Sequence, residues 1–114
     1  MLTPASLEKR LRDLSQMVKL KIKKLKSSYA LVSYENGAYT ITIPPDHDDD
    51  YNLRTFLHEL VHIACGPELS PWGVLFQEAF LERCIEPLMI QHIIANPTRH
   101  RWWLKRLKAI SNAN

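Results

Sequence analysis

The chain has 114 residues, 46% of them hydrophobic, so we expect a single domain over residues 1–114 with one modest core. No apolar run approaches the ~18 residues of a membrane span, and the first residues lack the apolar stretch of a signal peptide. We therefore expect a cytoplasmic protein without a membrane partner. Two cysteines, Cys65 and Cys84, are too few for a disulfide framework and are expected to be small buried side chains.

The first third of the chain predicts a helix followed by extended structure. Thr3-Pro4 is a typical helix start, with Thr as the cap and Pro in the first turn. Apolar residues then repeat at intervals of three and four, which predicts a helix from residue 4 into the low or mid twenties. Residues 19–26 partly alternate Lys with Leu and Ile, so the helix can instead end early and pass into extended chain.

A β-hairpin is predicted over residues 29–43. Two segments rich in β-forming residues, 29–34 and 38–43, flank Asn36-Gly37, the strongest short-range hairpin signal. Pro44-Pro45 ends the second strand, because proline cannot donate a ladder hydrogen bond.

The motif His-Glu-x-x-His occupies residues 58–62, within a predicted helix. Apolar residues recur at helical spacing over residues 53–64, acidic residues precede them, and Gly66-Pro67 follows as a stop signal. On a helix His58 and His62 lie on the same face, where two imidazoles can close on one metal ion. Glu59, rotated by about 100°, lies beside such a metal and suits a general base toward zinc-bound water.

Three further helices are expected after the motif. Ser70-Pro71 starts one that runs to about residue 85, and Glu86-Pro87 breaks, kinks or restarts it. A short apolar helix covers residues 88–95, and Thr98 caps a last helix over residues 99–110. The predicted fold class is therefore α+β, with a small antiparallel sheet among helices.

A hydrolytic zinc site usually takes three protein ligands, and the helix after the motif offers Glu78, Glu82 and Glu86. Glu78 and Glu82 are four residues apart and share a face, so one can bind zinc while the other supports a ligand histidine. The residues alone leave open which of the two is the ligand. Four side chains elsewhere in the chain are potential hydrogen-bond donors to a substrate carbonyl oxygen: Tyr34, Tyr51, His92 and His100.

The motif and the Pro-Trp-containing helix after it resemble the gluzincin metallopeptidases over about residues 53–86, and the length and layout are similar to the single-domain minigluzincins. This resemblance implies a zincin-like fold and a Zn²⁺-dependent peptidase acting on a peptide or protein substrate. It implies His58, His62 and Glu78 as metal ligands, Glu59 as the catalytic base, and Glu82 as a supporting or alternative ligand. It also implies a latent form if residues 99–114 cover the cleft.

The alternative reading is a non-catalytic binding module with a vestigial or structural metal site. The net charge is +3, and basic residues cluster at 19–26 and 99–108. Such clusters bind phosphate backbones in some proteins, but they are more often solvated helix faces. Nucleic acid is therefore the less favoured partner, and a peptidase is the favoured function.

Overall fold

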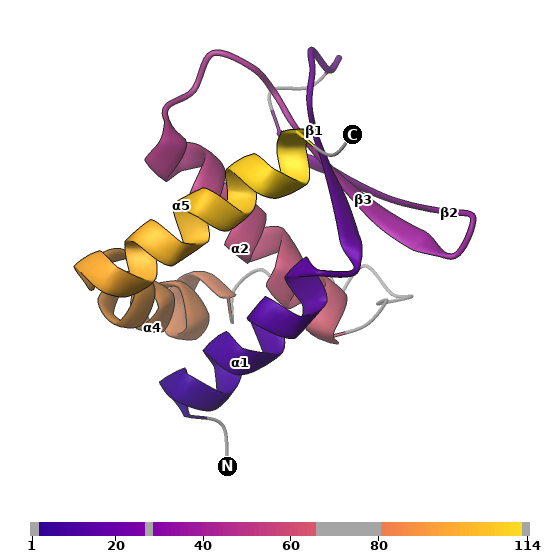
Figure 1. The fold of residues 1–114 in the computed structure, drawn as a ribbon. Coiled ribbons are helices and arrows are strands. Elements are labelled where there is room, and N and C mark those ends of the chain that lie inside the picture. Colours follow the sequence, from indigo (N-terminus) through magenta and orange to yellow (C-terminus); the bar gives the residue numbers. More distant parts are fainter. Residues whose placement is uncertain (1–2, 27–28, 66–80, 113–114) are drawn as a thin grey trace.

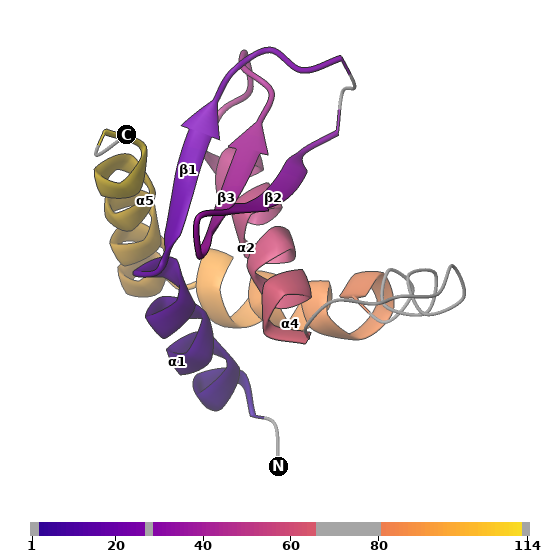
Figure 2. The same ribbon diagram turned by 90° about the vertical axis from the view of Figure 1, so that its right-hand side faces the viewer.

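The computed structural model describes residues 3–26, 29–65 and 81–112, which form a mixed α+β architecture. In Figure 2 the strands lie in front of α2, α5 flanks one edge of the sheet, and no helix with a described fold covers the face toward the viewer. The elements in chain order are α1 (Pro4–Ser15), β1 (Val18–Ile22), β2 (Leu31–Glu35), β3 (Ala38–Ile43), α2 (Asp49–Cys65), η1 (Leu81–Ile85), α4 (Glu86–Met89), η2 (Ile90–Ile94) and α5 (Pro97–Asn112).

The start of α1 is confirmed, whereas its predicted extension into the twenties is wrong. Thr3 and Ser6 form a reciprocal capping box, and Pro4 occupies the first turn. The helix ends at Ser15 and the chain becomes strand β1 at Val18, as the alternation of Lys with apolar residues had suggested. Val18 and Leu20 are buried while Lys19 and Lys21 are exposed, which is the two-residue period of a strand with one covered face.

The predicted hairpin is confirmed, but the sheet is mixed rather than antiparallel. β2 and β3 pair antiparallel, and β1 joins the other side of β3 in parallel, giving the order β1-β3-β2 among the described strands. The central strand β3 buries Ile41 and Ile43 completely. Lys-rich β1 and partly exposed β2 form the edges, where charged and polar residues limit unwanted pairing.

The hairpin turn depends on two residues with left-handed backbones, Asn36 (φ 53°) and Gly37 (φ 79°). A Cβ at Gly37 would meet no atom within 4 Å, so only the backbone angle opposes a side chain there. We therefore expect Gly37→Ala to lower the free energy of unfolding by about 1–2 kcal/mol, measured by urea denaturation. Asn36→Gly is the matched control and should change it little, because glycine adopts positive φ freely. An unchanged stability in Gly37→Ala would contradict this account of the turn.

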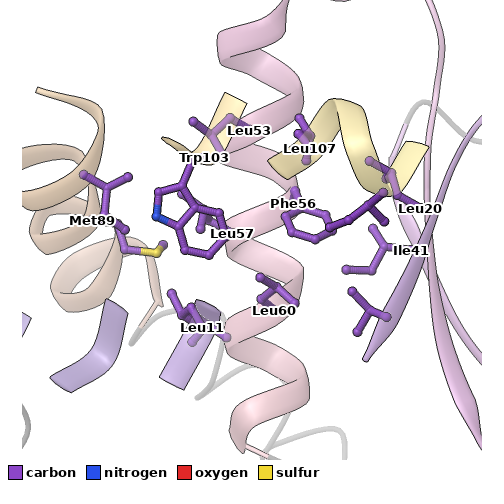
Figure 3. Close-up of a cluster of buried hydrophobic side chains, with 14 of the residues drawn as sticks. Leu11, Leu20, Ile41, Leu53, Phe56, Leu57, Leu60, Met89, Trp103 and Leu107 are labelled. Atoms are coloured by element: carbon purple, nitrogen blue, oxygen red, sulfur yellow. The ribbon is translucent and has the colours of Figure 1, made fainter. Parts of the chain in front are cut away.

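Helix α2 runs through the core and supports the motif (Figure 3). Asp48 caps it, accepting a hydrogen bond from the Tyr51 backbone N–H at 2.7 Å. One face of the helix is fully buried, and its side chains pack against α1, β3 and α5. The fully buried residues of this face are Leu53, Phe56, Leu57 and Leu60. The histidines lie on the remaining surface of the same rigid helix.

The chain remains helical through Glu86-Pro87. The backbone hydrogen bonds are π-helical in η1 and α-helical in α4, which begins at Glu86. The interruption predicted at Glu86-Pro87 is therefore a change of helix type and not a break. Pro87 falls in the first turn of α4, where a missing N–H is tolerated. The predicted helix from residue 70 lies outside the described residues as far as residue 80.

Two smaller expectations about the second half of the chain are wrong. Asn96, not Thr98, caps α5, because its Oδ1 accepts the Arg99 backbone N–H at 3.1 Å. The thiol of Cys84 is exposed rather than buried; the side chain of Cys65 is outside the described part. None of the described helices has both the length and the apolar composition needed to cross a bilayer.

Candidate active site

The polar side of α2 faces a cavity of about 600 Å³. Three stretches of chain enclose it: the residues just before β2, the outward face of α2, and the helical segment from α4 to η2. Its lining consists of Tyr29, Ala30, Tyr51, Arg54, Thr55, Leu57, His58, Glu59, Glu86, Met89, Ile90 and Ile94. This volume lies within the range of small-molecule and peptide side-chain pockets. Two of the three motif residues, His58 and Glu59, open onto it.

The two motif histidines lie on one face of α2, as their spacing predicted. Their ring centroids are 5.0 Å apart, and the ring planes are inclined at 66°. Two imidazoles bound tetrahedrally to one zinc at 2.0–2.1 Å would have centroids about 5 Å apart. The pair therefore fits the spacing that a shared zinc ion requires.

Glu86 contacts the first motif histidine. Its Oε1 lies 2.7 Å from His58 Nδ1, and the two residues come from α4 and α2. An ionised carboxylate only accepts hydrogen bonds, so Nδ1 carries the proton and the lone pair of a neutral His58 ring is on Nε2. This contact fixes the ring orientation and the tautomer in the way that outer carboxylates do at zinc-binding histidines.

Glu59 is half-buried and lines the cavity next to His58. It leaves α2 about 100° around the helix axis from His58, so its carboxylate flanks the histidine pair. Arg54 and Tyr51 line the same cavity, one and two turns before His58. The Glu59 carboxylate, the Arg54 guanidinium and the Tyr51 hydroxyl therefore line one cavity. Together they can bind a polar group of a substrate, and the carboxylate can accept a proton from it.

Among the four donors considered from the sequence, Tyr51 alone lines the cavity. His92 approaches Glu8, His100 pairs with Asp50 at 2.7 Å, and the Tyr34 ring packs on Tyr39. Arg54 was not among the residues predicted for the site, although it lies four residues before His58 and therefore on the same face of α2. Glu86 was predicted only as one of three glutamates spaced by four residues, with Glu78 and Glu82.

The predicted third ligand is not described. Glu78 lies outside the described residues, and so does the side chain of Glu82. Within the described ranges, no group of three or more His, Cys, Asp or Glu residues is arranged to hold a metal ion. The histidine pair and Glu86 therefore make up the described part of the candidate metal centre.

The described helix α5 packs into the core instead of over the cavity. Trp103 is fully buried, Leu107 and Ile110 are nearly so, and the cavity lining includes no residue from the described part of this helix. Deleting residues 99–114 would therefore remove core side chains, so the deletion would report on folding.

Comparison of the chain with models of protein families, with curated proteins and with solved structures found no match.

Proposed function

We propose that the protein is a zinc-dependent peptidase with a zincin-like active site. The observation that carries the proposal is the pair of motif histidines, which lie on one helix face with ring centroids 5.0 Å apart beside the cavity that Glu59 lines. Two histidines at this spacing, with a carboxylate following the first, are the arrangement that hydrolytic zinc sites use.

In this proposal His58 and His62 hold the metal, and Glu78 completes the set, with Glu82 as the alternative. When bound, zinc lowers the pKa of its water and polarises the scissile carbonyl. Glu59 takes the proton from the attacking water and gives it to the leaving amine. Glu86 holds the Nδ1–H of His58, so that the opposite nitrogen of the ring is the one that can bind metal.

The proposed substrate is an extended peptide segment. Tyr29 and Ala30 line the cavity and lead directly into β2, an edge strand of the described sheet. An edge strand offers unpaired backbone groups to an added strand, and this arrangement would lay a peptide along β2 and into the cavity. The cavity lining includes four residues whose side chains can donate hydrogen bonds to its carbonyl oxygens: Tyr29, Tyr51, Arg54 and Thr55.

Zinc affinity, measured by competition with a chromogenic chelator, tests this assignment. We expect one zinc per chain in the wild type and none in His58→Ala or His62→Ala. Loss of zinc in Glu78→Ala, with weaker binding in Glu82→Ala, would identify the third ligand; the reverse order would identify Glu82. Glu86→Gln should bind zinc about 10–100-fold more weakly, as is typical when an outer carboxylate is removed.

Asp13→Asn is the control, because this exposed carboxylate on α1 pairs only weakly, at 3.8 Å, with Lys9. It should leave zinc affinity unchanged. Zinc binding that persists in both histidine variants, or a wild-type protein that takes up no zinc, would contradict the proposed function.

A further inference from the structure

Acidic and basic residues occupy largely different segments of this chain. Residues 14–34 and 87–114 contain ten of the 15 lysines and arginines and none of the 12 aspartates and glutamates. The other five basic residues share the remainder of the chain with all the acidic ones. A net charge of +3 therefore combines two strongly basic segments with an acidic remainder.

The two basic segments meet in space. Helix α5 packs against strand β1, and Figures 1 and 2 both show them side by side. We call their exposed cationic surface the basic face. It consists of Lys19, Lys21, Lys23 and Lys24 from β1 and the residues after it, with Arg101, Lys105 and Lys108 from α5. The α5 residues are spaced by four and three, so they form one stripe along the helix.

The basic face differs in its ion pairing from the other arginines of α5. No ion pair is found for any of its seven side chains among the described residues. By contrast, Arg99 pairs with Glu8 at 3.2 Å, and Arg106 donates to the Ser15 carbonyl at 3.3 Å. These two arginines of α5 are used internally, whereas the exposed stripe is directed to solvent.

The uncovered side of the sheet adds polar groups to this surface. A hollow of about 360 Å³ is lined by Lys19, Lys21, Asn36, Ala38 and Thr40, with the carboxylate-bearing Glu35 at the hairpin end. Hydroxyl, amide and ammonium groups together are the donors that contact phosphate and sugar oxygens in nucleic-acid complexes.

We propose that the basic face binds the phosphate backbone of nucleic acid without reading sequence. Lys19 and Lys21 project from the same side of a strand, about 6.6 Å apart, so both ammonium groups can approach one phosphate backbone. Helix α5, which packs against β1, adds three further exposed cations that a polymeric anion can contact. The outward side of the described sheet has no aromatic side chain, so it offers no platform for stacked bases. Its residues are Lys19, Lys21, Leu31, Ser33, Glu35, Ala38, Thr40 and Thr42.

This binding surface is separate from the candidate active site. The basic face includes edge strand β1, whereas the cavity adjoins the segment before the opposite edge strand, β2. The two sites share no residue. The inference is therefore independent of the proposed peptidase activity, and the variant Glu59→Gln should bind nucleic acid as the wild type does.

Fluorescence anisotropy with a labelled 20-base-pair DNA and a 20-nucleotide single strand, over a salt series from 50 to 200 mM, tests the proposal. Two double variants remove basic charge: Lys19→Gln with Lys21→Gln, and Lys105→Gln with Lys108→Gln. We expect each to weaken binding about tenfold at low salt and to reduce the slope of log affinity against log salt by about 2. The control, Lys9→Gln with Arg83→Gln, removes two exposed cations elsewhere and should leave binding unchanged.

Circular dichroism of each variant confirms that its fold is intact before the comparison. The absence of wild-type binding to either oligonucleotide at 50 mM salt would overturn the proposal, and so would an equal loss in the control variant. Vesicles with 30% phosphatidylserine are tested in parallel. Binding to vesicles without binding to either oligonucleotide would overturn it in favour of a lipid surface.

Discussion

Glu59→Gln is expected to retain zinc and to lose peptide hydrolysis by about 10²–10⁴-fold, the usual contribution of a positioned general base. Glutamine has nearly the shape of glutamate, but its neutral amide cannot accept a proton from water. The helical rotation of about 100° per residue places residue 59 beside the histidine pair and outside the proposed set of metal ligands. The substitution therefore removes the proton acceptor and leaves the proposed ligands in place.

The measurement compares hydrolysis of an unfolded generic protein substrate with zinc content in the same preparations. Glu35→Gln, at the end of β2, makes the same chemical change outside the cavity and should keep full activity. Retained hydrolysis in Glu59→Gln would remove Glu59 from the role of base. Loss of zinc together with hydrolysis would instead place Glu59 among the metal ligands.

The elements predicted correctly from the sequence are those specified by neighbouring residues. Asn36-Gly37 determines its hairpin because both residues accept positive φ, and the structure shows them there. Helix α2 follows from its own apolar period and from the Asp48 cap. The same local geometry places His58 and His62 on one face, so the histidine pair needed no tertiary information.

The features missed from the sequence depend on contacts between distant segments. Nothing local to residues 18–22 indicates that β1 pairs in parallel with β3, because the pairing partner lies beyond an intervening hairpin strand. The contact of Glu86 with His58 joins residues 28 apart and follows from the packing of α4 beside the cavity. Likewise, the two basic segments were seen in the sequence as separate clusters, and their union is a property of the fold.

A buried carboxylate that the sequence does not reveal connects three helical segments. Glu8 on α1 is 7% exposed and accepts hydrogen bonds from Trp103 Nε1 at 3.1 Å, an Arg12 guanidinium nitrogen at 3.2 Å and Arg99 Nε at 3.2 Å. His92 Nε2 lies 3.3 Å from its Oε1, within ion-pair distance but without hydrogen-bond geometry. One carboxylate thereby satisfies donors from α1 and α5 and faces η2.

Glu8→Ala is expected to lower the free energy of unfolding by about 1–3 kcal/mol, because it leaves the buried Trp103 N–H without its acceptor and removes the partner of the half-buried Arg12 and Arg99. Urea denaturation measures the change. Asp13→Ala on the same helix is the control and should cost less than about 1 kcal/mol, since its carboxylate is exposed and its pair with Lys9 is long. Similar losses in the two variants would mean that the effect comes from α1 as a helix and not from the Glu8 contacts.

The Glu8 carboxylate should also make the free energy of unfolding depend on pH in the acid range. Burial raises the pKa of Glu8, but the hydrogen bond from Trp103 and the charge of Arg12 outweigh it, so the folded pKa is lowered. A lowered folded pKa stabilises the protein above the unfolded value of about 4.3, and this contribution is lost as pH falls through the folded value. Glu8→Gln cannot titrate, so its free energy of unfolding, measured from pH 6 to pH 2.5, should fall less steeply below pH 4.3 than that of the wild type. An identical acid slope in the two proteins would show that other carboxylates, and not Glu8, cause the acid sensitivity.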